Sequence, residues 1–474
     1  MLGLLIQKEL KEVIGSTKFA VTFAVCSVLI LLAFYTGAQN YEVSRQQYEA
    51  SKTENLRQME GLTDWMMLRN HRIFRSPEPL AALVTGVSND VGRSITVRGQ
   101  GSLAAEDSRF NDEPIFAVFR FLDLDFIFQI VLSLFAILFA YDAINGEKER
   151  GTLRLVFANA IPRAKFILGK IIGSFTALAV PLLIPILLGC LLLPILGVHL
   201  NTDEWLRLGM VILAGMLYFG VFLMLSVFIS SITRRSSSSF LLLLVVWIFS
   251  VLIIPRSAVL MAGRAVDVPS VDEIASQKSR LSRQLWTEDR EKMSSFKPTD
   301  SSDPQKMMEE FQKMMQDNAD EREKRMSDLD AKLSEERNNR LRTQESAAFS
   351  FARISPTAAF SLAVTNLTGS STDLKQHFLN EAAAYQQSYA EFMKEKTGMN
   401  IGGGGFVFRM RHSGDGEEEE EKPIDPRELP EFKYSGIPMD KVVTAALPEM
   451  GILAVFNLLF FAGAFAMFMR FDLR

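Results

Sequence analysis

The polar residues with the most distinctive spacing lie in one short segment, from Tyr141 to Lys165. Its first half has dense mixed charge and reads Asn145-Gly146-Glu147-Lys148-Glu149-Arg150-Gly151-Thr152. A short apolar ridge follows at Leu153, Leu155, Val156 and Phe157. Water satisfies such a ridge poorly, so we expect it to dock into a protein groove or onto the bilayer surface. The pattern therefore indicates a binding surface rather than a site that breaks bonds.

The usual signatures of catalysis and of metal binding are missing from the sequence. It has no phosphate-binding GxxxxGK[ST] motif, no GxSxG motif and no kinase motif set. The two cysteines, Cys26 and Cys190, lie inside apolar runs and cannot form a CxxC site. No histidine has HExxH spacing, and we interpret all four as ordinary surface or loop residues: His71, His199, His377 and His412. The sequence therefore predicts no catalytic, cofactor or metal site on this chain.

Two stretches of simple composition lie near the C-terminal end. The glycines from Gly402 to Gly405 predict a flexible hinge or linker. The acidic run from Glu417 to Glu421 could attract a divalent cation, but it lacks the spaced ligands and the glycine of an EF-hand loop. We favour a solvated loop for this run.

The distribution of apolar residues decides the class of protein. The chain has 51 basic and 55 acidic residues and a net charge of -4, which gives no basic footprint for nucleic acid. Its mean hydropathy of +0.13 is unremarkable, but the apolar residues gather in runs long enough to cross a bilayer. We predict an α-helical integral membrane protein with six transmembrane helices, at residues 19–38, 122–141, 166–196, 208–232, 236–254 and 450–469.

Two of these predicted segments have special features. The third span is over-long and contains Pro181, Pro185 and Pro194, which predicts either a kinked helix or a span followed by a re-entrant piece. Before the first span, residues 1–18 alternate apolar and charged side chains at helical spacing. We expect an uncleaved amphipathic helix on the membrane surface there, rather than a secretory signal peptide.

Lysine and arginine in the short loops predict the orientation. They cluster before the first span, in the 142–165 loop, at Arg234 and Arg235, and at the C-terminal end. With six spans these positions all fall on one side, so we expect cytoplasmic N and C termini in a cell inner or plasma membrane. The long segments 39–121 and 255–447 then lie outside the membrane on the opposite side.

We expect the two long outer segments to be mostly helical, with a small β element. Ser94 to Arg98 alternates like a strand. Ser270 and Glu273 form a capping box, and Ser355-Pro356 and Asp373 begin further helices. A stripe of methionine, phenylalanine and leucine between Pro304 and Leu341 fits either the seam of a coiled-coil hairpin or dimer, or a solvated helix against a neighbour in the same domain.

The predicted spans contain almost no charge, and Lys170 lies close to one end of the third. Carriers driven by ion gradients usually bury charged residues along their path. We therefore expect energy, if it is used, to come from elsewhere.

The loop after the second span resembles a known motif. Glu147-Lys148-Glu149-Arg150-Gly151-Thr152-Leu153, followed by Pro162-Arg163 and Leu168-Gly169-Lys170, resembles the loop between spans two and three of ABC exporter permeases of the type-two, six-helix class. The N-terminal helix with Gln7-Lys8-Glu9-Leu10 is similar to the elbow helix of that family. The large outer segments resemble a subset that includes copper-site-maturation and gliding-associated members.

The resemblance implies that this loop couples the spans to a separate ATPase. The partners are then a cytosolic ABC ATPase subunit carrying ATP and Mg²⁺, a second permease copy or a homologous permease, and membrane lipid, with an extracytoplasmic protein as a further candidate. Charge pairs would position the loop and the apolar ridge would grip the ATPase. The implied coupling residues are Glu147, Glu149, Arg150, Gly151, Leu153, Leu155, Phe157 and Arg163.

Three functions remain open from the sequence. The leading one is a permease subunit of an ATP-driven exporter of a lipid, amphiphile or peptide-like substrate, or one that delivers the substrate outside the membrane. The second is a mechanotransmission protein, in which the same spans move the outer domain and nothing crosses. The third is a membrane-anchored scaffold without an ATPase partner.

Overall fold

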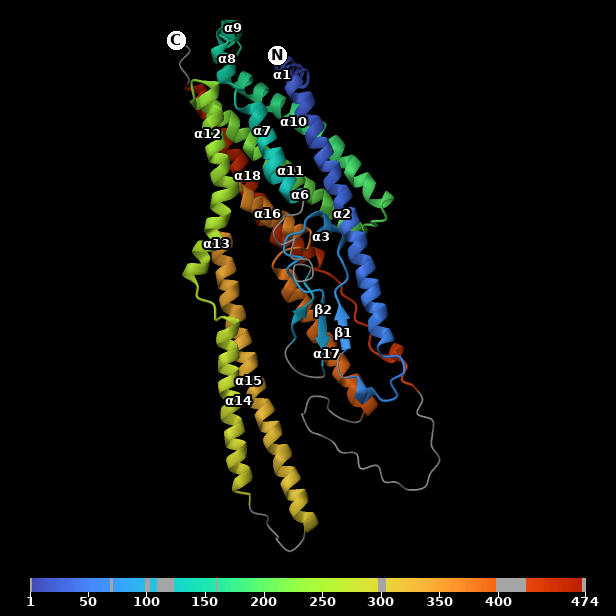
Figure 1. The fold of residues 1–474 in the computed structure, drawn as a ribbon. Coiled ribbons are helices and arrows are strands. Elements are labelled where there is room, and N and C mark those ends of the chain that lie inside the picture. Colours follow the sequence, from blue (N-terminus) through green and yellow to red (C-terminus); the bar gives the residue numbers. More distant parts are fainter. Residues whose placement is uncertain are drawn as a thin grey trace.

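A computed structural model describes residues 2–68, 71–98, 103–108, 123–158, 161–296, 304–397 and 423–470. Within these residues the fold is mostly helical, with a small antiparallel sheet, as predicted (Figure 1). The glycines Gly402 to Gly405, the acidic run Glu417 to Glu421 and the predicted start of the second span at Leu122 lie outside them.

Six of the described helical segments are long and apolar enough to cross a membrane, which confirms the prediction of six such helices. They form one bundle, with α1 (Leu2–Ile14) at the end where the chain begins (Figure 1). The six are α2 (Thr17–Arg57), the segment α6–η2–α7 (Leu124–Phe126, Ile127–Leu132, Ser133–Ala140), α10 (Arg163–Ile195), α11 (Thr202–Ile232), the segment α12–η3–α13 (Ser236–Ile248, Phe249–Ile253, Ile254–Ala265) and α18 (Met439–Met469).

The three prolines of the third predicted span do not break it. α10 runs without interruption from Arg163 to Ile195 and contains Pro181, Pro185 and Pro194. The uninterrupted helix excludes a span followed by a re-entrant piece, one of the two alternatives left open by the sequence. A span of this kind tolerates proline because neighbouring helices and local adjustments satisfy the freed backbone groups.

The end of the bundle at which α1 lies also holds α8 (Asn145–Glu149) and α9 (Thr152–Ala158), and we call it the proximal end (Figure 1). At the opposite, distal end a pair of long helices projects away from the bundle. These are α14 (Val271–Ser294) and α15 (Pro304–Ala352), which we call the distal hairpin. Lys278 pairs with Asp330, and Lys292 pairs with Glu321 at 2.8 Å, so the two helices run antiparallel. α15 thus packs against a neighbour from its own chain.

A second hydrophobic core forms a small distal domain. β1 (His71–Phe74), β2 (Ser94–Val97) and β3 (Ala105–Glu106) pair in that order, and α17 (Asp373–Thr397) covers them. The short helices η1 (Trp65–Met67) and η4 (Pro426–Glu428) complete it, whereas the buried Leu80 and Leu83 of α3 (Pro79–Leu83) belong to the core of the bundle, beside α2. The helix of the first span continues beyond its apolar run and ends at Arg57. The chain then turns at Gly61, whose φ is +87°, and enters the sheet.

The interpretation of all four histidines as surface or loop residues is wrong for His71. Its side chain is buried between β1 and α17, with Nε2 2.9 Å from the Tyr385 hydroxyl and the ring stacked on Tyr389. A strand at this position carries His71 inward because side chains alternate between the two faces of a sheet.

The helix α16 (Pro356–Leu367) fills the distal half of the bundle between the long helices. Phe360 stacks on Tyr218 with ring centroids 4.7 Å apart, and both side chains are fully buried. Thr357 Oγ1 lies 3.1 Å from the Tyr218 hydroxyl. This apolar helix therefore packs against the spans.

Candidate functional site

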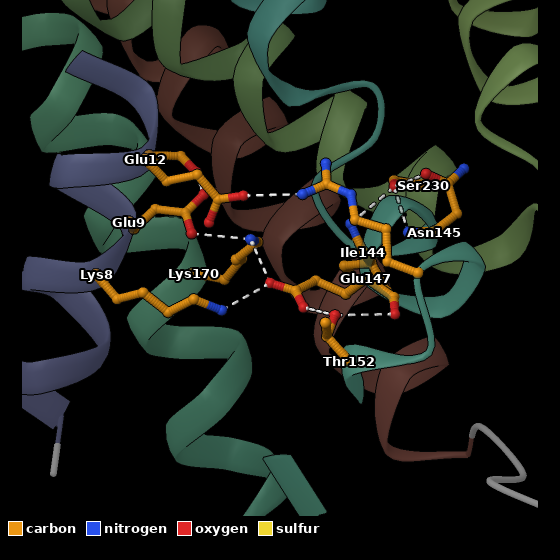
Figure 2. A network of polar contacts seen from close by, with 11 residues as sticks. Lys8, Glu9, Glu12, Ile144, Asn145, Glu147, Thr152, Lys170 and Ser230 are labelled. Carbon is orange, nitrogen blue, oxygen red and sulfur yellow. Dashed lines mark hydrogen bonds and ion pairs between the residues drawn. The ribbon is translucent and has the colours of Figure 1, made fainter. Parts of the chain in front are cut away.

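The proximal end holds a network of buried charges around Glu147. The Glu147 carboxylate accepts from Lys8 Nζ at 3.0 Å and from Lys170 Nζ at 3.4 Å, and it also contacts the Thr152 hydroxyl (Figure 2). Lys170 forms a second ion pair with Glu9 at 2.8 Å. Glu9, Glu147 and Lys170 are each less than 9% exposed. Three parts of the chain, α1, α8 and α10, are thereby joined by alternating charges.

Small residues allow α1 to lie directly on α10. A Cβ atom at Gly169 would lie 2.9 Å from the Leu5 Cβ, and one at Gly173 would lie 2.7 Å from the Glu9 Cβ. Glycines four residues apart face the same side of a helix and permit close approach of a second helix. Glu9 is held further by Ser174, whose hydroxyl donates to its carboxylate at 3.0 Å.

The other two predicted charges of the loop also make contacts within the chain. Arg150 donates to Glu12 of α1 at 3.1 Å, where both side chains are exposed. Glu149 accepts hydrogen bonds from the backbone N–H of Ser236 at 2.8 Å and from its hydroxyl at 2.9 Å. Ser236 is the first residue of α12, so Glu149 caps the start of that helix.

The turn between α11 and α12 is fixed to the start of α8. The Ser230 hydroxyl accepts from the backbone N–H of Ile144 at 3.0 Å and donates to the Asn145 side chain at 3.0 Å (Figure 2). The Asn145 amide donates to Thr233 at 3.0 Å. All these polar groups are buried or half-buried, and each is satisfied by a partner from another element.

The apolar ridge divides into an inward and an outward part. Leu153 is buried, and Phe157 packs on Phe166 of α10 and Phe468 of α18 at centroid distances of 5.6 and 6.2 Å. Leu155 points outward and is 67% exposed. Gly151 separates α8 from α9 with a φ of +74°, a conformation that glycine adopts without strain. Arg163 begins α10 and donates to the Met469 carbonyl at 3.0 Å.

The structure therefore brings all eight predicted coupling residues to the proximal end. Sequence reasoning missed the contacts that four distant residues make with them: Lys8, Glu12, Lys170 and Ser236. It also missed Glu9, Ser174 and Ser230, which extend the same network. Two signals could have found some of them. Lys170 is a single charge inside an apolar run, and Gly169 and Gly173 have the four-residue spacing of a helix contact.

Comparison with known proteins identifies the family of this chain. The family model described as ABC-2 family transporter protein matches residues 4–473. A probable ABC transporter permease protein NosY of Stutzerimonas stutzeri is 36% identical over 127 residues, which are 26% of this chain and 45% of that protein. The protein of the same name from Pseudomonas aeruginosa is 32% identical over 163 residues, 34% of this chain and 57% of that protein.

The chain thus spans about half the length of the curated relatives that it matches. The family match covers nearly the whole chain, including the proximal network and the distal hairpin. This chain belongs to the ABC-2 family of transporter proteins, as a multi-pass membrane permease subunit and not the ATPase.

Proposed function

We propose that this permease subunit converts ATP-driven closure of a separate ATPase into movement of its distal hairpin. The proximal end then faces the cytoplasm, with both termini, in an inner or plasma membrane, and the distal domain is extracytoplasmic. Leu155 and its neighbours on α9 form the contact with the ATPase. A second copy or a homologous permease completes the assembly, because ABC ATPases close in pairs and a symmetric machine needs two docking loops.

The observation that carries the proposal is that two routes join the coupling loop to the base of the distal hairpin. On the first route, Glu149 caps α12 at Ser236, and α12 continues through η3 and α13 toward α14. A helix transmits displacement along its axis because its backbone hydrogen bonds make it stiff. Movement of α8 thus reaches α13, which the short segment 266–270 joins to the first helix of the hairpin.

The second route passes through α18. Phe157 and Arg163 contact the proximal end of α18 at Phe468 and Met469. Toward its distal end, the buried Glu449 accepts from Arg353 Nε at 2.9 Å, and Arg353 follows the last residue of α15. Both helices of the hairpin are therefore tied to spans that touch the coupling loop.

Packing in the distal half of the bundle also favours movement over a passage. Within the described residues α16 occupies the space between α11 and α18, and its side chains Ala359, Phe360 and Ala363 are fully buried. A substrate path through this region would require α16 to leave. Rigid-body tilting of the spans needs no such rearrangement.

Export of a lipid, amphiphile or peptide-like substrate is the second candidate. Broad apolar faces on α10 and α18 favour it, because they would meet the corresponding faces of a second copy and could line a lateral path. These faces include the exposed side chains Ile184, Leu187, Leu191, Val455, Leu458 and Leu459. Membership of a transporter permease family argues against the scaffold without an ATPase partner.

Docking of the ATPase is tested by co-purification with a matched control. Leu155→Asp introduces a carboxylate at the proximal end, and Val271→Asp introduces one at the distal end. The two replaced side chains are equally exposed, at 67%. We expect Leu155→Asp to lose the ATPase and Val271→Asp to retain it. Retention by both variants would exclude α9 as the docking element.

Export is tested separately in vesicles that contain the complete complex. ATP-dependent translocation of a fluorescent phospholipid, lost in an ATPase-inactive partner, would replace the movement proposal with export. Hydrolysis of ATP without such translocation, together with movement of the distal hairpin, agrees with mechanotransmission.

A further inference from the structure

A cavity of about 340 Å³ lies on the distal side, between α2 and the first part of the distal domain. This volume falls within the range of small-molecule sites, about 300–1,000 Å³. One wall is a single face of α2 just beyond its apolar run, with Asn40, Ser44 and Tyr48. The opposite wall comes from β1, α3 and β2 and the loops between them. The coupling network lies at the other end of the molecule, so the cavity is separate from it.

Three of the four charged side chains that line the cavity, Arg75, Arg93 and Asp107, are hydrogen-bonded to uncharged polar side chains or to the backbone. Arg93 donates to the Gln47 side chain at 2.8 Å and to the Asp107 carbonyl at 3.2 Å. Asp107 accepts from the Ser94 hydroxyl, and Arg75 donates to the Ser88 carbonyl at 3.0 Å. With Glu78 the lining holds two positive and two negative side chains. A phosphate or carboxylate ligand would have to compete with these contacts, so the cavity does not favour an anion.

The fourth charged side chain of the lining is Glu78, and burial favours the protonated, uncharged form of its carboxyl. It raises the pKa of Glu78 to about 7, although the nearby Arg75 partly opposes this shift. Near neutral pH this carboxyl is therefore protonated for much of the time and can both donate and accept a hydrogen bond. Such a group suits hydroxyl ligands better than ions.

Uncharged hydrogen-bonding groups make up the rest of the polar lining. Among the described residues no partner donates to or accepts from five of these side chains: Asn40, Ser44, Tyr48, Ser76 and Asn89. They stand beside the aromatic rings of Tyr41, Tyr48 and Phe74. Amides and hydroxyls bond the alternating hydroxyls of a sugar, and aromatic rings pack on its C–H faces.

We propose that this cavity binds a neutral sugar unit, either a free saccharide or the headgroup of a glycolipid. The position of the cavity is compatible with both sources. Asn40 follows the apolar run of α2 directly, which is where headgroups lie, and Tyr48 is about 12 Å further along the helix axis at 1.5 Å per residue.

The test uses the full chain in phospholipid nanodiscs from which any maltoside detergent has been exchanged. Saturation-transfer NMR is recorded with maltose, N,N′-diacetylchitobiose and methyl α-mannoside, and in a second arm with nanodiscs that contain monogalactosyl diacylglycerol. We expect at least one probe to bind. Binding of the soluble probes identifies a free saccharide, whereas binding in the glycolipid arm alone identifies a headgroup.

Variants locate the binding to the cavity. Asn89→Ala and Tyr48→Ala should each weaken the Kd by about tenfold, the effect of losing roughly one good hydrogen bond or ring contact. Tyr48→Phe keeps the ring and should weaken binding less, which controls for misfolding. Gln46→Ala is the matched control, since Gln46 lies on α2 outside the cavity lining and bonds to Glu42.

Three results would overturn the proposal. In the first, no probe binds in either arm. In the second, a probe binds but its Kd is unchanged in Asn89→Ala and Tyr48→Ala. In the third, inorganic phosphate or phosphocholine binds and displaces the sugars, which would make the cavity an ion site.

Discussion

Replacing Glu147 by glutamine tests whether the buried charges hold α1 against the coupling loop. The substitution keeps the size of the side chain and removes its charge, so Lys8 and Lys170 lose a common partner. Removing one member of a buried ion pair costs about 3–5 kcal/mol, because the remaining charge stays desolvated. Lys170 still has Glu9 at 2.8 Å, and Lys8 is half exposed. We therefore expect a smaller loss, about 2–3 kcal/mol.

Hydrogen exchange of the α1 amides measures this loss locally. A change of 1.4 kcal/mol corresponds to a factor of about ten, so protection of α1 should fall by roughly 30- to 150-fold in full-length Glu147→Gln in nanodiscs. Glu12→Gln is the matched control, since Glu12 lies on the same helix and pairs with Arg150 at an exposed position. An exposed pair contributes about 0–1 kcal/mol, which predicts less than about a fivefold change. Equal loss of protection in the two variants would refute the argument from burial.

Three further predictions concern packing, pH and the base of the distal hairpin. Gly173→Ala places a Cβ 2.7 Å from the Glu9 Cβ, so it should destabilise the contact of α1 with α10 by about 1–3 kcal/mol in the same exchange experiment. Gly209→Ala is the control and should leave this contact unchanged, because nothing lies within 4 Å of the added Cβ. Burial lowers the pKa of His71 to about 4, below the ordinary 6.5, so the distal domain should lose about 2 kcal/mol as the pH falls from about 7 to about 5. Exchange of β1 and α17 amides, corrected for the intrinsic rate, measures this loss, and an equal loss in His71→Gln would assign it to other groups. Glu449→Gln removes the charge of a buried partner of Arg353, so the end of α15 should lose about 1–3 kcal/mol of local stability. Glu336→Gln, in the exposed pair with Arg340, should lower the local stability by about 0.5 kcal/mol or less. No difference between those two glutamine variants would show that the Arg353 contact does not hold the hairpin.

Length and apolar composition were enough to predict the six long helices, because a membrane span leaves a signal that needs no knowledge of its neighbours. Local capping rules identified helix starts, as Ser270 accepts from the Glu273 N–H and Ser355 caps α16, although only this half of the predicted capping box is present among the described residues. Such signals depend on residues a few positions apart, which the sequence displays directly.

Contacts between distant segments could not be predicted in this way. The loop motif identified Glu147, but its partners Lys8 and Lys170 come from two other helices, and only packing brings them together. The burial of His71 likewise follows from a sheet whose strands are separated by a long connection. Phe157 points inward and Leu155 points outward because of where α10 and α18 lie. The sequence therefore predicted the apolar ridge but not which of its side chains are buried.

Spin-label distances across the distal end test the central claim most directly. Cys26 and Cys190 are replaced by alanine, and labels are placed on Gln46 of α2 and Glu335 of α15, both exposed. In the complete complex with its ATPase, trapping ATP should shift the distance distribution between the two labels. In Glu149→Ala/Phe157→Ala, which removes the cap of α12 and the ring contact with α18, the shift should be lost or much reduced while the ATPase stays bound. An unchanged distribution on trapping ATP in the parent protein, or a full shift in this double variant, would contradict transmission of force from the coupling loop to the distal hairpin.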